Sequence, residues 1–321
     1  MSIRYVANEF INKTKWDQCI RQAVNGRVYA YSWYLDIMSD NWDALIIGED
    51  TYETVFPLTF RKKMGIHYLH QPFFTQQLGI FSVNKITPEL IDDFLNAIPT
   101  KFVFAEINLN TLNKPDPEKW NVINNANYEL DLIEPFDSLY KGFSTNIKRN
   151  VVKAEQKLIR VSDTVNPEET IKLFRENRGA SLQKLKDNDY KRLTQLIYHG
   201  IHKQIAFSYG AYTNTNTLCA GMIIFISHFK ATFLFSATND EARESGAMSM
   251  LISQFVFSAA GNHLTLDFEG SNNPQLARFY KSFGAQRIEY PSVTINKFPF
   301  PLKQAFKFYK SIKTGKESKE A

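Results

Sequence analysis

The sequence predicts an α/β fold with two similar domains in tandem, each built on a mixed central sheet with helices on its faces. Three observations support this prediction. The chain of 321 residues is long enough for two domains. Its apolar residues recur with the spacings of strands and of amphipathic helices. The order of the predicted elements in the first half recurs in the second half. One large α/β domain is the alternative.

Turn residues and cap signals place the elements of the first half. Gly48 and Gly65 bound runs of apolar residues, which favours strands between them. Thr87 followed by Pro88 is a helix start signal, and Pro99 marks the end of that helix. In order, we predict a strand at 3–7, helices at 15–24 and 31–38, strands at 44–48, 53–61 and 66–69, a helix at 88–99, and strands at 102–109 and 127–133.

The second half is predicted to repeat this order. Gly261 follows an apolar helix, as expected of the small residue just past a helix end. The halves share little residue identity, so the repeat is one of element order. We predict a strand at 158–165, helices at 167–178 and 190–203, strands at 205–213, 218–228 and 231–237, a helix at 247–260, a strand at 263–269, a helix at 274–283 and a closing strand at 286–294.

A basic amphipathic helix is expected to link the halves. The predicted organisation is a first domain at 1–136, the linking helix at 137–157, a second domain at 158–300, and a C-terminal helix and tail at 301–321. Apolar residues of the linking helix recur at spacings of three and four: Ile147, Val151, Ala154 and Leu158. Its other faces carry Lys148, Arg149, Lys153 and Lys157. A solvated face is the simpler interpretation, and an anion-binding ridge is the alternative.

Composition excludes several classes of protein. The hydrophobic fraction is 44% and the aromatic fraction 14%, which rules out a disordered or collagen-like chain. Two cysteines cannot form a disulfide framework, which favours a reducing compartment. The 38 basic and 33 acidic residues give a net charge of +5, a mild surplus that permits an anionic partner without requiring one. With no apolar run near the ~18 residues of a membrane span, we expect a cytoplasmic protein.

Two carboxylates on the strand at 263–269 are the first candidate catalytic groups. In an extended strand, Asp267 and Glu269 point to the same side, opposite Leu266 and Phe268. Residues two positions apart on a strand are separated by about 6.6 Å along the strand. The two carboxylates would therefore disfavour each other's ionisation, and one of them could act as a base near neutral pH. The alternative is that both accept hydrogen bonds from amides of the loop after Gly270.

The turn before the helix at 247–260 is a candidate anion site. The first N–H groups of a helix are unpaired, and with the helix dipole they bind phosphate well. Gly246 would let a ligand approach the backbone, and Arg243 adds a positive charge.

Together these segments resemble the GNAT acyltransferase family. Its coenzyme-binding motif, Arg/Gln-x-x-Gly-x-Gly/Ala, is matched by Arg243 and Gly246, whereas Met248 stands at the last small position. A second pattern, Asn-x-x-Ala-x-x-x-Tyr-x-x-x-Gly-Phe, is matched by Asn273, Tyr280 and Gly284. The resemblance implies that Tyr280 protonates the departing thiolate of coenzyme A; a core tyrosine is the alternative. The donor-binding residues that it implies are Ser236, Ala237, Thr238, Arg243, Gly246, Ala247, Met248 and Asn273.

Two GNAT-like halves in one chain resemble the Fem-type branch, tandem GNAT proteins that transfer amino acids from aminoacyl-tRNA to peptidoglycan precursors. The segments 267–271 and 68–79 and the basic linking helix carry this resemblance. We see no long helical arm of the kind that some Fem-type enzymes insert for RNA, which lowers the expectation of a tRNA donor.

The segment at 71–79 is a candidate acceptor site. Gln71, Gln76 and Gln77 carry neutral amides that can bind polar groups of a peptide or sugar, and Phe73 supplies an apolar wall. The alternative is an ordered loop whose glutamines bind its own backbone. No histidine pair is completed by Cys or carboxylate at metal-ligand spacing, so we expect no metal.

The leading hypothesis is an N-acyltransferase. Its second half would bind acyl-CoA or aminoacyl-tRNA, and its first half would help bind a small-molecule or peptide amine. Asp267 or Glu269 would accept the amine proton and Tyr280 would assist the leaving group. The rival is a binding protein of the same fold that has lost the chemistry, which Met248 favours. An RNA-binding role is third.

Overall fold

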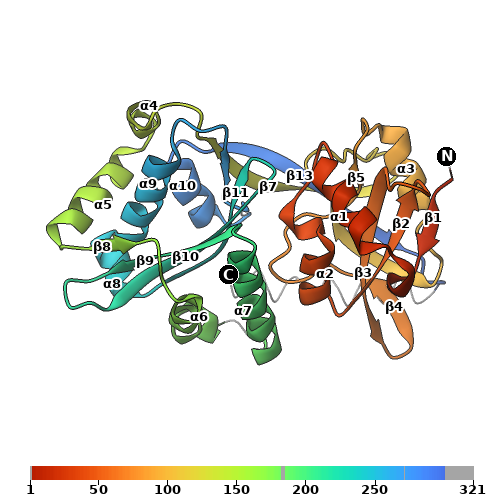
Figure 1. The fold of residues 1–321 in the computed structure, drawn as a ribbon, viewed down its shortest axis with the longest axis horizontal. Helices are drawn as coiled ribbons and strands as arrows, with labels where there is room; N and C mark the ends of the chain where they lie inside the picture. Colours follow the sequence, from red (N-terminus) through yellow and green to blue (C-terminus); the bar gives the residue numbers. More distant parts are fainter. Residues whose placement is uncertain (1, 182–184, 271, 301–321) are drawn as a thin grey trace.

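The computed structural model describes residues 2–181, 185–270 and 272–300, and it has the predicted α/β architecture. Within these residues the strands join into one mixed sheet of 13 strands. Figure 1 shows the elements of the first half gathered at one end of the molecule and most of those of the second half at the other. The predicted C-terminal helix and tail at 301–321 lie outside the described residues.

The elements of the first half follow the predicted order. The Thr87 side chain accepts a hydrogen bond from the Leu90 N–H, and Pro88 is the first residue of the helix, as its start signal predicted. The short strand β5 was not predicted. In order, the elements are β1 (Arg4–Val6), η1 (Asn8–Phe10), α1 (Lys13–Gln22), η2 (Val28–Ala30), α2 (Ser32–Met38), β2 (Asn41–Ile47), β3 (Thr54–Lys63), β4 (Ile66–Leu69), β5 (Phe81–Ser82), α3 (Pro88–Asn96), β6 (Phe102–Asn108) and β7 (Asn121–Asp131).

Three local predictions for the rest of the chain were wrong. The linking helix predicted at 137–157 is two helices, α4 and α5, separated at 142–144. The turn predicted before the helix at 247–260 contains a short helix, α8. The strand predicted at 263–269 extends over three residues, so Glu269 lies outside it. The elements are α4 (Phe136–Lys141), α5 (Thr145–Gln156), β8 (Arg160–Ser162), α6 (Pro167–Glu176), η3 (Arg178–Ser181), α7 (Asp187–His202), β9 (Ala206–Tyr212), β10 (Leu218–Ser227), β11 (Lys230–Thr238), α8 (Asp240–Ser245), α9 (Ala247–Ala259), β12 (Thr265–Asp267), α10 (Pro274–Lys281) and β13 (Gln286–Asn296).

The sheet runs without a break through both halves. Its strand order is β1-β2-β3-β4-β6-β13-β7-β12-β11-β10-β9-β8, with β5 paired to β3. The strand expected to close the first half, β7, lies between β12 and β13. The closing strand of the second half, β13, pairs with β6. The two strands thus lie at the middle of the sheet (Figure 1), and the predicted domain limits at 136 and 158 stay a prediction.

Helices cover both faces of the second half of the sheet, as alternating residues of β10 demonstrate. Ile223 and Phe225 belong to a core that also contains residues of α2 and α7. Met222 and Ile224 belong to a second core with residues of α9. A strand buried on both faces has a nearly continuous apolar sequence, as β10 has. The first of these cores includes residues from both halves of the chain, so the halves are packed together.

Two pairs of parallel strands diverge, one in each half. In the first half β4 and β6 pair over a few residues, and the segment that follows β4 then fills the space between them: the Leu78 N–H donates to the Asn108 carbonyl at 2.9 Å. In the second half β11 and β12 pair only from Lys230 to Thr232, after which β11 continues to Thr238 alongside β10 alone. The second divergence leads to the site described next.

The second part of the predicted linking helix, α5, belongs to the second core. Ser144 caps α5 by accepting from the Ile147 N–H, as predicted from its start sequence. Ile147 and Ala154 of α5 are fully buried with residues of α8 and α9. None of the helices in the described ranges is both long and apolar enough to cross a bilayer.

Candidate functional site

A cavity of about 380 Å³ lies where β11 and β12 diverge. Its volume falls within the ~300–1,000 Å³ range of small-molecule sites. Residues from β11, α5, the α8–α9 turn and α10 line it: Asn150, Phe233, Ser236, Thr238, Ala242, Arg243, Gly246, Met248, Ser249, Leu276, Phe279 and Tyr280. This is the position at which the sequence placed the donor-binding turn.

Most of the predicted donor residues line this cavity. Ser236, Thr238, Arg243, Gly246 and Met248 are all part of its wall. The other three predicted residues have structural positions instead: Ala237 and Ala247 are buried in the interior, and Asn273 caps α10 by accepting from the Gln275 and Leu276 N–H groups. The Arg243 guanidinium is exposed and pairs with Asp240, so part of its charge is already compensated.

The expected approach of a ligand to Gly246 stays a prediction, and the structure shows a second reason for a glycine at this position. Gly246 has φ +81°, and a Cβ built on it would lie 2.5 Å from the backbone oxygen of Asn150. The close contact at this glycine is therefore made by α5. Glycine is required here because α5 packs against the turn and because the left-handed conformation disfavours other residues.

Tyr280 forms the inner wall of the cavity. Its ring stacks on Phe268, with centroids 4.8 Å apart and planes at 21°. Burial, with a smaller contribution from the Glu269 carboxylate, raises the pKa of Tyr280 to about 12. The phenol is therefore protonated at neutral pH. The two interpretations of this residue, a core tyrosine and a proton donor, are compatible in this position.

Asp267 is an ion-paired residue of the interior. Its carboxylate is 2.9 Å from Nη1 of Arg27, and its Oδ1 accepts from Asn127 Nδ2 at 3.0 Å and from the Glu269 N–H at 2.9 Å. Only 1% of its side chain is exposed. Both oxygens of this carboxylate are therefore taken by groups of the protein itself.

Glu269 is the better candidate base. The Tyr29 hydroxyl donates a hydrogen bond to its Oε1. Burial, followed by the charge of Asp267, outweighs that hydrogen bond and the charge of Arg27, and it raises the pKa of Glu269 to about 8. The effect of Asp267 on the pKa of Glu269 is in the direction expected from the sequence, but burial is the larger cause. A carboxyl with this pKa can accept or donate a proton near neutral pH.

Several residues beside these carboxylates were not predicted. Lys230 Nζ lies 2.5 Å from the Glu129 carboxylate, and Arg27 Nη2 lies 3.7 Å from it. Burial and the charge of Asp267 raise the pKa of Glu129. No local signal in the sequence marks Arg27, because its partner Asp267 lies 240 positions away.

The side-chain amides of the glutamines in the segment at 71–79 all donate to groups of the protein itself. Gln71 binds its own loop, donating to the Thr75 carbonyl at 2.8 Å, as the structural alternative predicted. Gln76 instead donates from Nε2 to the Glu269 backbone carbonyl, and Gln77 donates to Gln76 Oε1 at 2.7 Å. Phe73 is 36% exposed. This segment therefore brings the first half against the residue that carries the candidate base.

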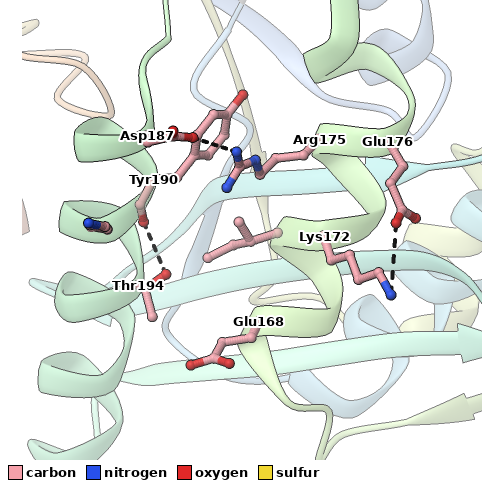
Figure 2. Close-up of a pocket in the computed structure, with 9 residues that line it drawn as sticks. Glu168, Lys172, Arg175, Glu176, Asp187, Tyr190 and Thr194 are labelled. Carbon is pink, nitrogen blue, oxygen red and sulfur yellow. Dashed lines mark hydrogen bonds and ion pairs between the residues drawn. The ribbon is translucent and has the colours of Figure 1, made fainter.

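A larger cavity, of about 540 Å³, lies between α6 and α7. Figure 2 shows that four of its charged side chains form two ion pairs, Arg175 with Asp187 and Lys172 with Glu176. None of the predicted site residues lines it. Within the described residues no group of three or more His, Cys, Asp and Glu side chains could hold a metal ion.

Comparison with known proteins gives structural matches. No protein-family model and no curated protein matches the sequence. FemX matches with a TM-score of 0.66 at 13% identity, over 95% of this chain and 99% of FemX. The two proteins share one fold. L-PGS from Bacillus licheniformis matches with a TM-score of 0.51 at 11% identity, over 93% of this chain and 95% of L-PGS. A protein of unknown function from Bacteroides thetaiotaomicron matches with a TM-score of 0.58 at 10% identity, over 92% of this chain and 100% of that protein.

These matches bear on the fold. The FemX match extends over nearly the whole chain, so it agrees with the Fem-type resemblance drawn from the repeated element order. The predicted fold class, a mixed α/β sheet flanked by helices, is confirmed. At this level of identity the donor, the acceptor and the site residues have to be argued from the chain's own geometry.

Proposed function

We propose that this protein is an N-acyltransferase that holds an activated acyl donor in the cavity between β11 and α10. The observation that carries the proposal is the position of that cavity. Five predicted donor residues line it, and Tyr280 separates it from Phe268, the neighbour of Glu269 in sequence. The corresponding divergence in the first half is filled by the segment at 71–79, which supports a donor site in the second half only.

The chemistry needs one proton acceptor and one proton donor. The nitrogen of the amine attacks the acyl carbon and forms the new C–N bond, and its proton passes to the Glu269 carboxylate directly or through water. The bond from the acyl carbon to the leaving group then breaks, and the Tyr280 phenol gives its proton to that group. The raised pKa of each residue fits its role: Glu269 near 8 as base, Tyr280 near 12 as acid. Positioning supplies the rest of the rate.

The donor is acyl-CoA or aminoacyl-tRNA. Coenzyme A would place its pyrophosphate at the turn before α9, where Asn150 packs on Gly246 and Met248 replaces a small residue. These contacts disfavour the pyrophosphate and favour a donor that presents only its acyl end to the cavity. The acceptor would be a small-molecule or peptide amine, such as a cell-wall precursor, bound near Gln76 and Glu269.

A catalytically inactive binding protein is the second candidate. The same two observations, Met248 in the cavity wall and Asn150 against Gly246, favour it. It predicts binding in the cavity without turnover.

Donor consumption in a mixture of primary amines and amino-terminal peptides tests the proposal. Release of free thiol from acetyl-CoA, or deacylation of aminoacyl-tRNA, is measured against a no-enzyme blank and against Glu269→Gln. Acceptor-dependent consumption of one donor, lost in Glu269→Gln, is the expected result. If both donors bind but neither is consumed, the protein is a binding module. If neither binds, the proposal is wrong.

A further inference from the structure

We propose that Arg27 is a positioning residue of the candidate site: from the first half of the chain it holds the Asp267 carboxylate, and through it the backbone turn that carries Glu269. This inference concerns how the site is built, and it rests on the proposed role of Glu269 as base.

The first step is the contact between Arg27 and Asp267, which are separated by 240 positions in the sequence. Arg27 Nη1 lies 2.9 Å from Asp267 Oδ2, and the two side chains are 7% and 1% exposed. A buried pair of this kind is costly to break, because the remaining charge has no partner and no water. Arg27 comes just before η2 in the first half, and Asp267 ends β12 in the second, so this pair ties the two halves together at the site.

The second step is the link from Asp267 to Glu269. The other oxygen of the same carboxylate, Oδ1, accepts the backbone N–H of Glu269 at 2.9 Å. Glu269 has φ +54°, a left-handed conformation that side-chain-bearing residues adopt at an energetic cost. The hydrogen bond from its N–H to Asp267 holds this turn in place. Arg27 therefore acts on Glu269 through one carboxylate whose two oxygens have different partners.

The third step is the charge balance around Glu269. Arg27 and Lys230 balance Asp267 and Glu129. In the described part of the chain no cation pairs with Glu269 itself. The titratable groups that face it are Tyr29, Tyr34, Asp267, Arg27, Tyr280 and Tyr290. Arg27 is the cation of this set, and its charge opposes the effect of Asp267 on Glu269.

Two substitutions separate the charge of Arg27 from its geometry. Arg27→Gln leaves Asp267 without a counter-charge, which raises the pKa of Glu269 above 8 and loosens the turn. Arg27→Lys restores one positive charge, but its single ammonium cannot replace the two guanidinium nitrogens, one of which donates to Asp267 while the other lies 3.7 Å from Glu129. Arg192→Gln is the matched control. Arg192 also forms an ion pair, with its Nη2 2.7 Å from Asp40 Oδ1, but this pair is not part of the site.

The experiment is a carbon-13 NMR titration of glutamate carboxyls in the full-length chain, with the Glu269 signal assigned by its absence in Glu269→Gln. We expect a midpoint near pH 8 in the wild type and in Arg192→Gln, and a midpoint at least one unit higher in Arg27→Gln. Arg27→Lys should keep the wild-type midpoint within half a unit. Since this readout needs no turnover, it remains informative if no acyl transfer is found.

The rate gives the second readout once a donor is known. Arg27→Gln should lower kcat about tenfold or more at pH 7 with little change in KM for the donor, and should move the acid limb of the pH profile upward. An unchanged Glu269 midpoint in Arg27→Gln would overturn the proposal, as would a loss of activity that only follows the unfolded fraction. If Arg27→Gln does not fold, Arg27→Lys decides. The proposal then requires that Arg27→Lys keep the wild-type titration midpoint of Glu269 and still have a lower kcat.

Discussion

At the residue scale, Glu269 and Tyr280 have raised pKa values for the same first reason, burial, yet different consequences. Burial brings the pKa of the Glu269 carboxyl close to neutral pH, whereas it keeps the Tyr280 phenol protonated there. A pair of groups whose pKa values are separated by their surroundings is typical of acid–base sites.

Replacing Tyr280 by Phe tests its role as acid. The ring remains on Phe268, so the fold should be retained, and kcat should fall by ~10²–10⁴-fold, the usual contribution of a general acid. Tyr209→Phe is the control, because Tyr209 packs in the same core but does not line the cavity. Steady-state rates with the active donor decide; a Tyr280→Phe rate close to that of Tyr209→Phe would remove the assignment.

Replacing Glu269 by Gln tests its raised pKa through stability. The folded state keeps the Glu269 proton up to about pH 8, whereas the unfolded chain releases it near pH 4.5. The wild type should therefore lose stability relative to Glu269→Gln as the pH rises between these values, by at most about 1.4 kcal/mol per unit. Urea unfolding at several pH values measures the difference. A constant difference from pH 5 to 8 would show that the carboxyl is not perturbed.

At the element scale, the turn between α8 and α9 shows what local sequence could and could not predict. Gly246 and Met248 were located by their spacing, because a motif is a local property. The packing of α5 on that turn was not predictable, since it joins residues about 100 positions apart. The strand ending at Asp267 was predicted too long, because the Asp267 side chain accepts the Glu269 N–H and bends the chain there.

Two glycine substitutions measure the contact between α5 and this turn. Gly246 and Gly261 both have φ near +80°, but a Cβ at Gly261 would meet no atom within 4 Å. Gly261→Ala should cost only the left-handed conformation, about 1–2 kcal/mol. Gly246→Ala should cost a further ~1–3 kcal/mol, because its Cβ meets the Asn150 backbone. Equal losses in urea unfolding would mean that α5 does not press on the turn.

At the scale of the whole molecule, the pairing of β7 with β12 of the second half and of β13 with β6 of the first half could not be predicted from the sequence. The sequence located β13 and the second part of β7, but the pattern of a strand does not say which neighbour it pairs with. Asp131 pairs with Thr265 and Ser292 with Asn108, so both partners lie far along the chain. The same limit hid Arg27, whose partner Asp267 is in the other half.

A continuous sheet and a shared core predict that the halves unfold together. The sequence offers a local probe, because all four tryptophans (Trp16, Trp33, Trp42 and Trp120) lie in the first half. Tryptophan fluorescence should therefore give the same urea midpoint as far-ultraviolet circular dichroism, which reports both halves. Two separate midpoints would mean that the predicted domains are independently stable.

The central claim is that the cavity between β11 and α10 holds the acyl donor. Calorimetric titration with each donor, on the wild type and on Ser236→Phe, tests it most directly, because the added ring fills that cavity. Thr194→Phe, which places the same ring in the cavity between α6 and α7, is the control. We predict that one donor binds the wild type and Thr194→Phe alike, and that Ser236→Phe loses at least tenfold in affinity. Equal affinity in all three proteins would contradict the account.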